Sequence, residues 1–398
     1  MNSKDKYYID LFAGCGGLSL GLQKAGWKGI FAVEKNKDAF ETLKTNLIDK
    51  EGHFIWPDFL PKEPIDIKEL LSNQKNELCK LSGKVDLVVG GPPCQGFSMA
   101  GKRDSNDIRN TLVKSYIEFI KIIMPKMLFL ENVHGFTVGF DKDGKKGKPY
   151  SQYVAEKLKK LGYNIESKVI NVSEYGVPQR RKRFILIGML DKDPKEFFKK
   201  LEKNKIEFLK ERNLDTPITI SEAIGDLLKS NGTYPTPDAK GFESGKYGKI
   251  KSNYQKLMRK NTKINDIVDS HRYANHRQDS INLFTEMINT IQETKRITPK
   301  DGIIKGLKKR GVTVLKENSV CTTITSIPDD FVHYAEPRIM SVREMARIQS
   351  FPDDYKFKGK YTTGGKLRKI DVPRYTQVAN AVPPLFAEQV GIVLREML

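Results

Sequence analysis

A cysteine follows a short apolar run and two prolines in the segment Gly90-Gly-Pro-Pro-Cys-Gln-Gly-Phe-Ser98. The preceding run, Val85–Val89, predicts a β-strand, so Cys94 comes just after a strand end. The two prolines stiffen this loop and limit where the thiol can point. A thiol here can act as a nucleophile once its thiolate is stabilised, whereas structural cysteines usually lie inside apolar runs. Cys94 is therefore the candidate nucleophile, and Cys15 and Cys321 fit a structural role better.

Two further polar segments flank predicted strands. In Phe129-Leu-Glu-Asn-Val133, Glu131 follows an apolar strand, where a carboxyl group can act as an acid or a hydrogen-bond partner. A helix cap or a surface acid is the alternative for Glu131. In Tyr175-Gly-Val-Pro-Gln-Arg-Arg-Lys-Arg183, a basic cluster that contains Arg181 and Arg183 precedes a strand. By composition alone, that cluster could be a phosphate-binding patch.

A glycine-rich turn, Asp10-Leu-Phe-Ala-Gly-Cys-Gly-Gly-Leu18, connects the first predicted strand to a helix. Glycines are needed where a backbone turns sharply and approaches a ligand at the carboxyl end of a strand. Glu34 ends the next strand, where a carboxylate can bind both ribose hydroxyls of a nucleoside. The turn lacks the third glycine of the dinucleotide fingerprint, so a nucleotide-like cofactor is indicated and NAD is not preferred. A purely structural tight turn remains the alternative.

The elements that must position these residues alternate along the first half of the chain. Apolar, β-rich runs alternate with helical patterns, which is typical of a parallel sheet covered on both faces. We therefore expect an α/β fold with a doubly wound, mostly parallel sheet over residues 1–190. The predicted strands are 7–12, 29–34, 85–89, 127–130, 165–172 and 184–188, and the predicted helices between them are 18–25, 37–47, 110–123 and 151–161.

Composition excludes several classes of protein. The chain has 398 residues, of which 38% are hydrophobic and 30% are charged. No apolar run approaches the roughly 18 residues of a membrane span, and the first residues lack a signal peptide's apolar stretch, so we expect a cytoplasmic protein. Four cysteines are too few for a disulfide framework and too widely spaced for a metal knuckle. The five histidines show no metal-binding spacing, and no metal is expected.

The charge balance favours a polyanionic partner. Lys and Arg number 69 against 49 Asp and Glu, so the formal net charge is +20. After Met189 the regular alternation stops, which predicts a second, smaller domain over residues 191–335. Residues 240–263 and 295–316 each hold eight Lys or Arg and one acid. These two basic stretches are the best candidates for nucleic-acid contact, although solvated basic loops are the alternative.

Taken together and in this order, the motifs resemble the DNA (cytosine-5) methyltransferase family, of the bacterial restriction-modification type. DLFAGCGG is similar to the family's first motif, GGPPCQGFS to its nucleophile motif, ENV to its acid motif and QRRKR to its third catalytic motif. Near the end of the chain, 341–352 resembles the segment that supports the target-recognition domain, and 377–383 resembles the final cofactor-site motif. The resemblance covers residues 7–190 and 334–390, so the expected fold is that of an S-adenosylmethionine-dependent methyltransferase. It implies that 191–335 is the target-recognition domain and that 336–398 is a return segment that completes the first domain.

The resemblance implies a mechanism and its residues. Cys94 would add to C6 of a cytosine flipped out of duplex DNA, Glu131 would act at N3 and the exocyclic amine, and Arg181 and Arg183 would steady the base, the Cys94 loop or the acid. The base that removes the C5 proton is not visible. S-adenosyl-L-methionine would be the methyl donor and S-adenosyl-L-homocysteine the product. The residues implied in binding it are Phe12, Gly14, Gly16, Gly17, Leu18, Glu34, Asp66, Pro93, Leu112 and Asn380.

Some positions depart from the family pattern. Asp66 is the better candidate for the adenine amine and Asp58 is its rival. Lys35 stands where an aromatic residue is frequent, and Ala381 stands where serine or glycine is frequent. These departures leave individual contacts with the adenine open.

Three other functions compete with DNA methylation. A tRNA cytosine-5 methyltransferase of the same fold shares the thiol, acid and arginine motifs. A dinucleotide-dependent oxidoreductase explains Glu34 but not Cys94, Glu131 and Arg181 together, and a silent DNA-binding protein does not explain the intact Pro-Cys-Gln. The expected partners are double-stranded DNA, on which the chain would act as a monomer, and a restriction endonuclease that need not form a complex with it. The target sequence cannot be read from the residues.

Overall fold

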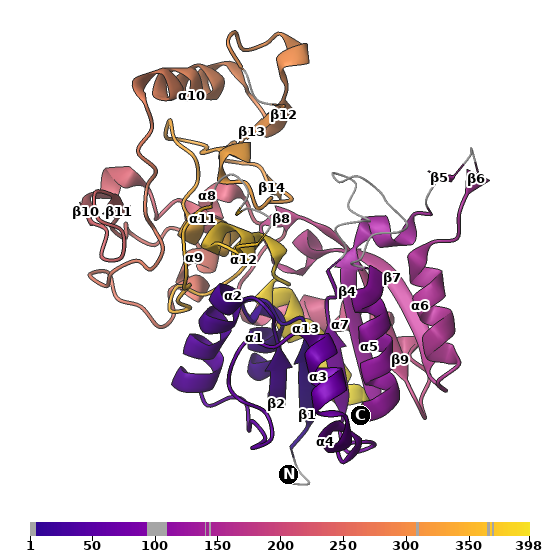
Figure 1. Cartoon of the computed structure of the whole chain (residues 1–398). Coiled ribbons are helices and arrows are strands. Elements are labelled where there is room, and N and C mark those ends of the chain that lie inside the picture. The colour runs from indigo at the N-terminus through magenta and orange to yellow at the C-terminus, as the bar shows by residue number, and fades with distance from the viewer. Residues whose placement is uncertain are drawn as a thin grey trace. The chain divides into compact units, whose positions relative to one another are not determined.

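The computed structural model describes residues 5–93, 110–139, 141–142, 145–307, 310–363, 367 and 370–398. The chain forms two compact units, each built from separate stretches of sequence. Unit 1 comprises Met1–Asn171, Lys182–Glu207 and Phe386–Leu398. Unit 2 comprises Val172–Arg181 and Phe208–Leu385. Figure 1 traces both along the chain by colour.

The centre of unit 1 is a six-stranded sheet in the order β2-β1-β3-β4-β9-β7. The pairs β1–β2, β1–β3 and β3–β4 are parallel, and β9 runs antiparallel to both of its neighbours. This arrangement confirms the predicted mostly parallel sheet. Its strands are β1 (Tyr7–Leu11), β2 (Lys28–Val33), β3 (Leu87–Gly90), β4 (Met127–Val133), β7 (Asn164–Asn171) and β9 (Lys182–Met189).

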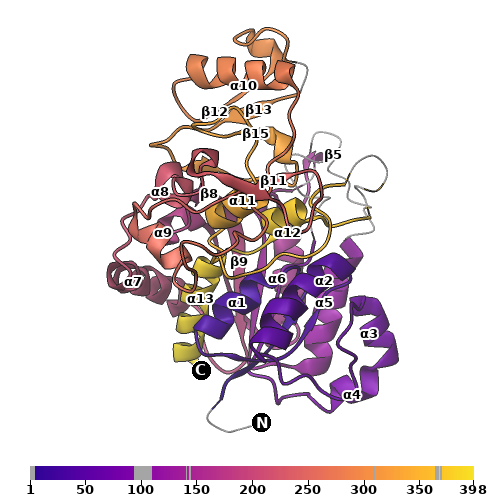
Figure 2. The ribbon, with the colours of Figure 1, turned by 90° about the vertical axis from the view of Figure 1, so that its left-hand side faces the viewer.

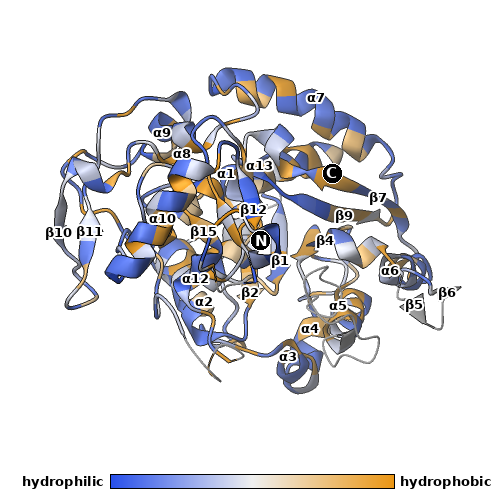
Figure 3. Ribbon diagram, turned by 90° about the horizontal axis from the view of Figure 1, so that it is seen from above, coloured by the Kyte–Doolittle hydropathy of each residue, from blue (hydrophilic) through white to orange (hydrophobic). Residues whose placement is uncertain are grey.

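The strands follow from their side chains. Every residue of β1 and of β3 is buried, as expected for strands covered on both faces and rich in Val, Ile and Leu. In the edge strand β7 only one of the eight residues is buried, and Figure 3 shows this strand mainly in the hydrophilic colour. The carboxyl ends of the parallel strands β1, β2, β3 and β4 meet at one end of the sheet.

Helices cover the sheet of unit 1. Neighbouring helices α3, α4, α5 and α6 contact one another in series, and Figure 2 shows α3 and α5 together. The C-terminal helix α13 packs closely against α1 at Gly21, where an added Cβ would collide with Ala387. The Trp27 indole N–H also donates to the Gly391 carbonyl at 2.8 Å. The helices are α1 (Gly17–Lys24), α2 (Lys37–Leu43) with a π-helix at Lys44–Lys50, α3 (Ile67–Asn73), α4 (Lys75–Cys79), α5 (Asn110–Ile123), α6 (Tyr150–Lys159), α7 (Glu196–Glu211) and α13 (Pro384–Met397).

The division into units differs from the predicted domain boundaries at three places. Residues 172–181 belong to unit 2, residues 191–207 belong to unit 1, and of the predicted return segment 336–398 only Phe386–Leu398 belongs to unit 1. Helices α7 and α13 therefore each extend from one unit into the other.

Unit 2 holds short helices and small sheets. β8 (Gln179–Arg180) pairs with β14 (Cys321–Thr322), β10 (Thr233–Pro235) with β11 (Glu243–Gly245), and β13 (Val312–Val314) lies between β12 (Lys295–Ile297) and β15 (Phe331–Val332). A further hairpin, β5 (Asp141–Lys142) with β6 (Lys145–Lys146), belongs to unit 1. The helices of unit 2 are α8 (Ile220–Ile224), α9 (Asn253–Met258), α10 (Gln278–Thr290), α11 (Val342–Ile348) and α12 (Arg374–Asn380).

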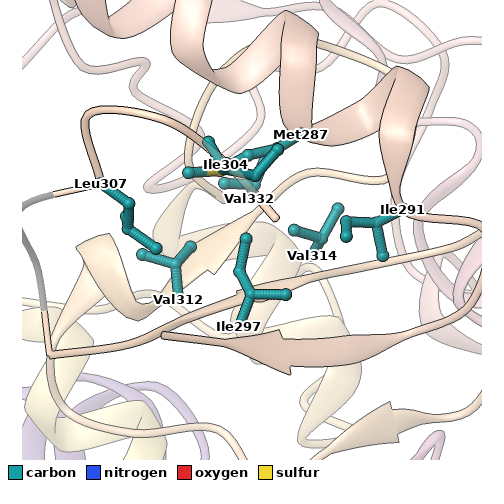
Figure 4. Close-up of a cluster of buried hydrophobic side chains, with 8 residues drawn as sticks. All are labelled: Met287, Ile291, Ile297, Ile304, Leu307, Val312, Val314 and Val332. Carbon is teal, nitrogen blue, oxygen red and sulfur yellow. The ribbon is translucent and has the colours of Figure 1, made fainter. Parts of the chain in front are cut away.

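A small hydrophobic core joins α10 to the β12-β13-β15 sheet. Met287 and Ile291 at the end of α10 pack on the sheet residues Val314 and Val332 (Figure 4). The other members are Ile297, Ile304, Leu307 and Val312. This core gives the segment with the second basic stretch a fixed shape.

Buried ion pairs explain why residues 336–385 pack in unit 2. Every residue of α11 is buried, although three of the seven carry charges. The Arg347 guanidinium lies 3.1 Å from an Asp226 carboxylate oxygen and 2.5 Å from Asp353. Asp226 also pairs with Arg259 at 3.1 Å. A buried arginine needs such partners, and Asp226 and Arg259 both lie within residues 191–335, so this segment must pack against that part of unit 2.

No helix in the described ranges is both long enough and apolar enough to cross a membrane.

Candidate active site

The glycine-rich turn after β1 has a backbone shape that demands glycine. Gly14 has φ +57° and Gly16, which precedes the first turn of α1, has φ +88°. Phe12 also adopts a positive φ of 60°, a strained value for a side chain of this size. A Cβ added at Gly14 would meet no atom within 4 Å. The turn therefore leaves open space directly in front of Gly14, at the carboxyl end of β1. Gly17 and Leu18 follow as the first, buried residues of α1.

The Glu34 carboxylate is oriented by this turn. One carboxylate oxygen accepts the Gly14 N–H at 2.9 Å, and the other accepts the Asn36 N–H at 2.7 Å. Burial raises the pKa of Glu34, and these backbone hydrogen bonds oppose the shift. Each oxygen keeps a lone pair beyond the bond it accepts, so the carboxylate can still receive hydroxyl donors. Open space at Gly14 beside a fixed carboxylate fits the ribose of a nucleoside.

Asp66 lies close to the same strand end. The Ile65 N–H donates to the Glu34 carbonyl at 2.9 Å, which brings the start of α3 beside β2. The Asp66 carboxylate caps α3 through the Lys68 N–H at 2.8 Å and pairs with the Lys35 ammonium at 2.8 Å. Asp58, the rival candidate, is exposed. Asp66 is thus adjacent to Glu34, and the unexpected Lys35 is its ion-pair partner.

Asp10 is a buried carboxyl group to which we assigned no role from the sequence. It lies near the end of β1, is 1% exposed and accepts a hydrogen bond from the Ser19 hydroxyl at 2.5 Å. Burial raises the pKa of Asp10 to about 7; the Ser19 hydrogen bond opposes this shift and the nearby Glu34 adds to it. The bond ties the strand to α1 across the glycine-rich turn.

The acid motif contacts the loop that leads toward Cys94. A Cβ added at Gly91 would lie 3.3 Å from the Glu131 Oε2 atom, so the absence of a side chain at Gly91 makes room for this carboxylate. The Asn132 amide donates to the Pro92 carbonyl at 3.1 Å. Two consecutive residues of β4 therefore hold the segment after β3. Asn132 was missed from the sequence, although its place in the ENV motif was visible.

Arg183 holds the Glu131 carboxylate from the next strand. The Arg183 Nε atom lies 2.8 Å from Glu131 Oε1, and the two side chains are only 10% and 13% exposed. In the antiparallel pair β4–β9, Val133 faces Arg183, so Glu131 is its diagonal neighbour. Burial lowers the pKa of Arg183, and the attraction of Glu131 opposes that shift.

Arg181 has a different environment from Arg183. It belongs to unit 2, where its guanidinium donates to the Ala379 carbonyl at 2.7 Å. Asn380, the next residue, ends α12 and is exposed. The two predicted arginines therefore have separate contacts: Arg183 contacts the acid and Arg181 contacts the segment that contains Asn380.

Cys94, the predicted nucleophile, lies outside the described residues. Pro93 directly before it is exposed, and Leu112 in α5 is partly buried. Burial raises the pKa of the Cys15 thiol to about 12 and raises that of Cys321 as well, so neither is a thiolate at neutral pH. Cys79 is exposed. Neither of the two buried cysteines therefore has the features of an activated nucleophile.

Unit 2 presents most of the predicted basic residues to solvent. In the first basic stretch, all seven lysines are exposed and Arg259 is buried with Asp226. In the second, Lys308 and Lys309 lie outside the described residues, and the exposed members among the others are Lys295, Arg296, Lys300, Lys305 and Arg310. The Lys316 ammonium donates to the Ile288 carbonyl at 2.6 Å. The charges of these stretches are therefore available to a polyanion.

Within the described ranges, no three His, Cys, Asp or Glu residues lie together as ligands for a metal ion.

Known proteins resemble this chain over nearly its whole length. The family model for C-5 cytosine-specific DNA methylase matches residues 7–395. The type II methyltransferase M.DdeI of Desulfomicrobium norvegicum is 31% identical over 96% of this chain and 86% of its own length. The type II methyltransferase M.XorII of Xanthomonas oryzae pv. oryzae is 31% identical over 96% of this chain and 83% of its own length.

Solved structures share the fold. A crystal structure described as a prophage-encoded DNA modification methyltransferase from E. coli has a TM-score of 0.65 at 20% identity, and the match covers 98% of this chain and 99% of that one. The Entamoeba histolytica methyltransferase EhMeth has a TM-score of 0.53 at 14% identity over 99% of both chains.

Proposed function

The chain belongs to the C-5 cytosine-specific DNA methylase family, and from this premise we propose that it methylates C5 of a flipped cytosine within one short duplex DNA sequence through a covalent bond between Cys94 and C6. The enzyme is a DNA (cytosine-5)-methyltransferase. The proposal concerns the mechanism, the residues that perform it and the biological role.

One observation supports the mechanism most strongly. The Glu131 carboxylate is fixed by Arg183 at 2.8 Å and lies against Gly91, three residues before Cys94. A nucleophile loop and an acid therefore meet at the carboxyl ends of two neighbouring parallel strands, β3 and β4. Ligand sites of open α/β sheets form at this edge.

The residue types account for the chemistry. C5 of cytosine is a poor nucleophile, so the Cys94 thiolate first forms a bond to C6 and pushes an electron pair toward C5. Glu131 binds N3 and the exocyclic amine, where it stabilises the charge that develops on the ring. When bound, S-adenosyl-L-methionine supplies the methyl group that C5 takes up, and S-adenosyl-L-homocysteine remains. A base then removes the C5 proton, the C5–C6 double bond re-forms, and the C6–sulfur bond breaks to release the Cys94 thiolate.

The cofactor residues follow from the turn and from the resemblance. Glu34 would bind the ribose hydroxyls and Asp66 the adenine amine, with the backbone at Phe12, Gly14, Gly16, Gly17 and Leu18 against the rest of the molecule. Pro93, Leu112 and Asn380 are the further proposed contacts. The open space at Gly14 supports this placement.

The biological role follows from the relatives. Unit 2 would read the duplex with its exposed basic stretches, and the chain would act as a monomer. The relatives are type II methyltransferases, so we propose that this enzyme protects the DNA of a bacterial host from a partner restriction endonuclease, in the cytoplasm. A methyl group in the major groove blocks the contacts that a nuclease needs.

Release of tritium from DNA labelled at C5 of cytosine tests this mechanism. Because the C5 hydrogen leaves only after addition at C6, tritium should appear in water when the enzyme and S-adenosyl-L-methionine are present. Cys94→Ala should release none while still binding DNA. Labelled tRNA is the matched substrate. Release from tRNA but not from DNA would contradict the proposal, as would release by Cys94→Ala.

A further inference from the structure

Arg272 in unit 2 is held between two aromatic rings. Its guanidinium carbon lies 4.1 Å from the centre of the Phe242 ring and 4.1 Å from the centre of the Tyr361 ring. Contact with two rings restricts the orientation of a guanidinium but satisfies none of its N–H donors. The side chain is therefore oriented before any ligand arrives.

None of the Arg272 donors has a partner among the described residues. Within the part of the chain that the structure describes, no hydrogen bond or ion pair forms at this guanidinium, and its Nε atom is buried without an acceptor. The two Nη atoms are not among the buried unpaired atoms, so they contact solvent. An arginine normally finds acceptors for its donors when it is fixed and partly buried. The two Nη groups of Arg272 are thus held in place and have no hydrogen-bond acceptor among the described residues.

The other ring-stacked arginines that the structure describes in unit 2 make the contrast clear. Each of them combines its ring with hydrogen-bond acceptors. Arg343 lies over Phe357 and pairs with Asp269 at 2.9 Å, and Arg374 lies over Tyr361 and pairs with Asp238 at 2.5 Å. The same holds for Arg212, Arg259 and Arg338.

The backbone of Arg272 is firmly anchored. Arg272 forms an antiparallel bridge with Ser244 of β11. The Tyr273 N–H donates to the Glu243 carbonyl at 2.8 Å. His271 and Tyr273 on either side are buried, and alternation along an extended segment turns Arg272 to the opposite face. The guanidinium therefore rests on both a fixed backbone and a fixed ring stack.

The charges around the stack do not balance. Asp238 is the acid of this cluster, and it already accepts bonds from Arg374 and from the Tyr361 hydroxyl at 2.9 Å. Burial and the nearby Arg374 lower the pKa of Arg272, while Asp238 opposes the shift. Among the described residues, the guanidinium groups of Arg272 and Arg374 both lie near the Asp238 carboxylate, so a further negatively charged group would be attracted to this cluster.

We infer that Arg272 is a DNA-contacting residue whose two Nη atoms bind a pair of acceptors on the duplex. This inference rests on the proposed function, because duplex DNA is the ligand. Two parts of DNA offer acceptors at the right spacing: the oxygens of a phosphate, and the O6 and N7 atoms of a guanine in the major groove. In both cases two acceptor atoms receive hydrogen bonds from the two Nη atoms of Arg272. The experiment distinguishes a phosphate from a guanine.

The test measures affinity for a duplex carrying the methylation target and for a scrambled duplex, at several salt concentrations. Arg272→Met removes the donors and fills the space between the rings. Arg212→Met is the matched control, because the Arg212 guanidinium also lies over a ring, at 3.5 Å from the Phe208 centre. Unlike Arg272, Arg212 donates hydrogen bonds to the Phe208 carbonyl and to the Glu211 carboxylate. Arg272→Lys keeps the charge without the fork. Melting temperatures verify that each variant is folded.

We expect Arg272→Met to weaken binding by about tenfold, and Arg212→Met to stay within about twofold, as for a surface change away from the interface. If the acceptor is a phosphate, Arg272→Met binds both duplexes more weakly, and the slope of log affinity against log salt concentration falls by about one. Arg272→Lys then recovers part of the lost affinity. If it is a guanine, only the target duplex loses affinity and Arg272→Lys recovers little.

Two outcomes contradict the inference. Folded Arg272→Met that binds both duplexes as tightly as the unchanged chain would overturn it alone, as would an equal loss in Arg212→Met. Failure of the unchanged chain to bind any duplex would instead contradict the proposed function, and the inference would fall with it. If Arg272→Met does not fold, Arg272→Gln takes its place under the same criteria.

Discussion

Replacing Arg183 by methionine removes the partner that holds the Glu131 carboxylate. The two groups lie 2.8 Å apart and are 10% and 13% exposed, so little water is present to replace the lost partner. Breaking a buried ion pair by removing one member costs about 3–5 kcal/mol, and we expect about 3 kcal/mol here because a little exposure remains. Glu131→Gln should have a cost of the same order, because it leaves the Arg183 guanidinium unpaired.

The double variant separates this pair from general damage. With both charges removed, no unpaired charge stays buried, so Arg183→Met/Glu131→Gln should be more stable than the sum of the single changes predicts. We expect a coupling free energy of about 2 kcal/mol, within the range for contacting residues. Urea unfolding followed by tryptophan fluorescence measures it, since Trp27 and Trp56, the two tryptophans of the chain, are both buried in unit 1. A coupling below about 0.5 kcal/mol would refute the reasoning, since that is the margin within which independent sites add.

Three further changes test other parts of the structure. Gly91→Ala would place a Cβ 3.3 Å from Glu131 Oε2, so methyl transfer should fall by about 10²-fold while the melting temperature changes little; unchanged kcat would contradict this placement. The pKa of Asp10 is raised from 3.8 to about 7 in the folded state, so the unchanged chain should lose stability as pH rises from 4 to 8, whereas Asp10→Asn should not. Relative to the unchanged chain, Asp10→Asn should therefore gain about 4 kcal/mol in the free energy of unfolding over this range, measured by urea unfolding. A difference between the two chains that does not change with pH would refute this prediction. Asp226→Asn should destabilise the chain by about 3–5 kcal/mol in unfolding followed by circular dichroism, because two buried arginines, Arg347 among them, lose their shared carboxylate; a loss below about 1 kcal/mol would show that the network does not need it.

The four parallel strands of the sheet were predictable because buried parallel strands appear as short apolar runs. All six predicted strands exist, with ends that differ by a few residues. The glycine turn, Glu34 and Glu131 were predictable for a related reason: polar residues directly after such runs must meet at one edge of the sheet. The helices α3 and α4 were not predicted, since they are short and carry few apolar residues.

The different contacts that neighbouring residues of one motif make could not be predicted from the sequence. Arg181 and Arg183 are two residues apart and look equivalent, yet they have different partners in different units. Asn132 holds the Pro92 carbonyl through a contact that only the pairing of β3 with β4 creates. Such roles depend on register, which the local sequence does not reveal.

The packing of residues 336–385 was also beyond the sequence. The resemblance predicted that this segment completes the first domain, whereas its buried arginines need carboxylates from far earlier in the chain. Arg347 pairs with Asp226, 121 residues away in sequence. The local sequence does not predict this ion pair, since by sequence alone Arg347 and Asp226 look like ordinary charged surface residues.

Genome-wide mapping of 5-methylcytosine in bacterial cells that express this chain tests the central claim most directly. The account predicts methylation at one short recurrent sequence, and none in cells that express Cys94→Ala at the same level. Unmodified DNA despite soluble expression would contradict it and make RNA the leading substrate. Equal methylation by Cys94→Ala would contradict the assignment of the nucleophile.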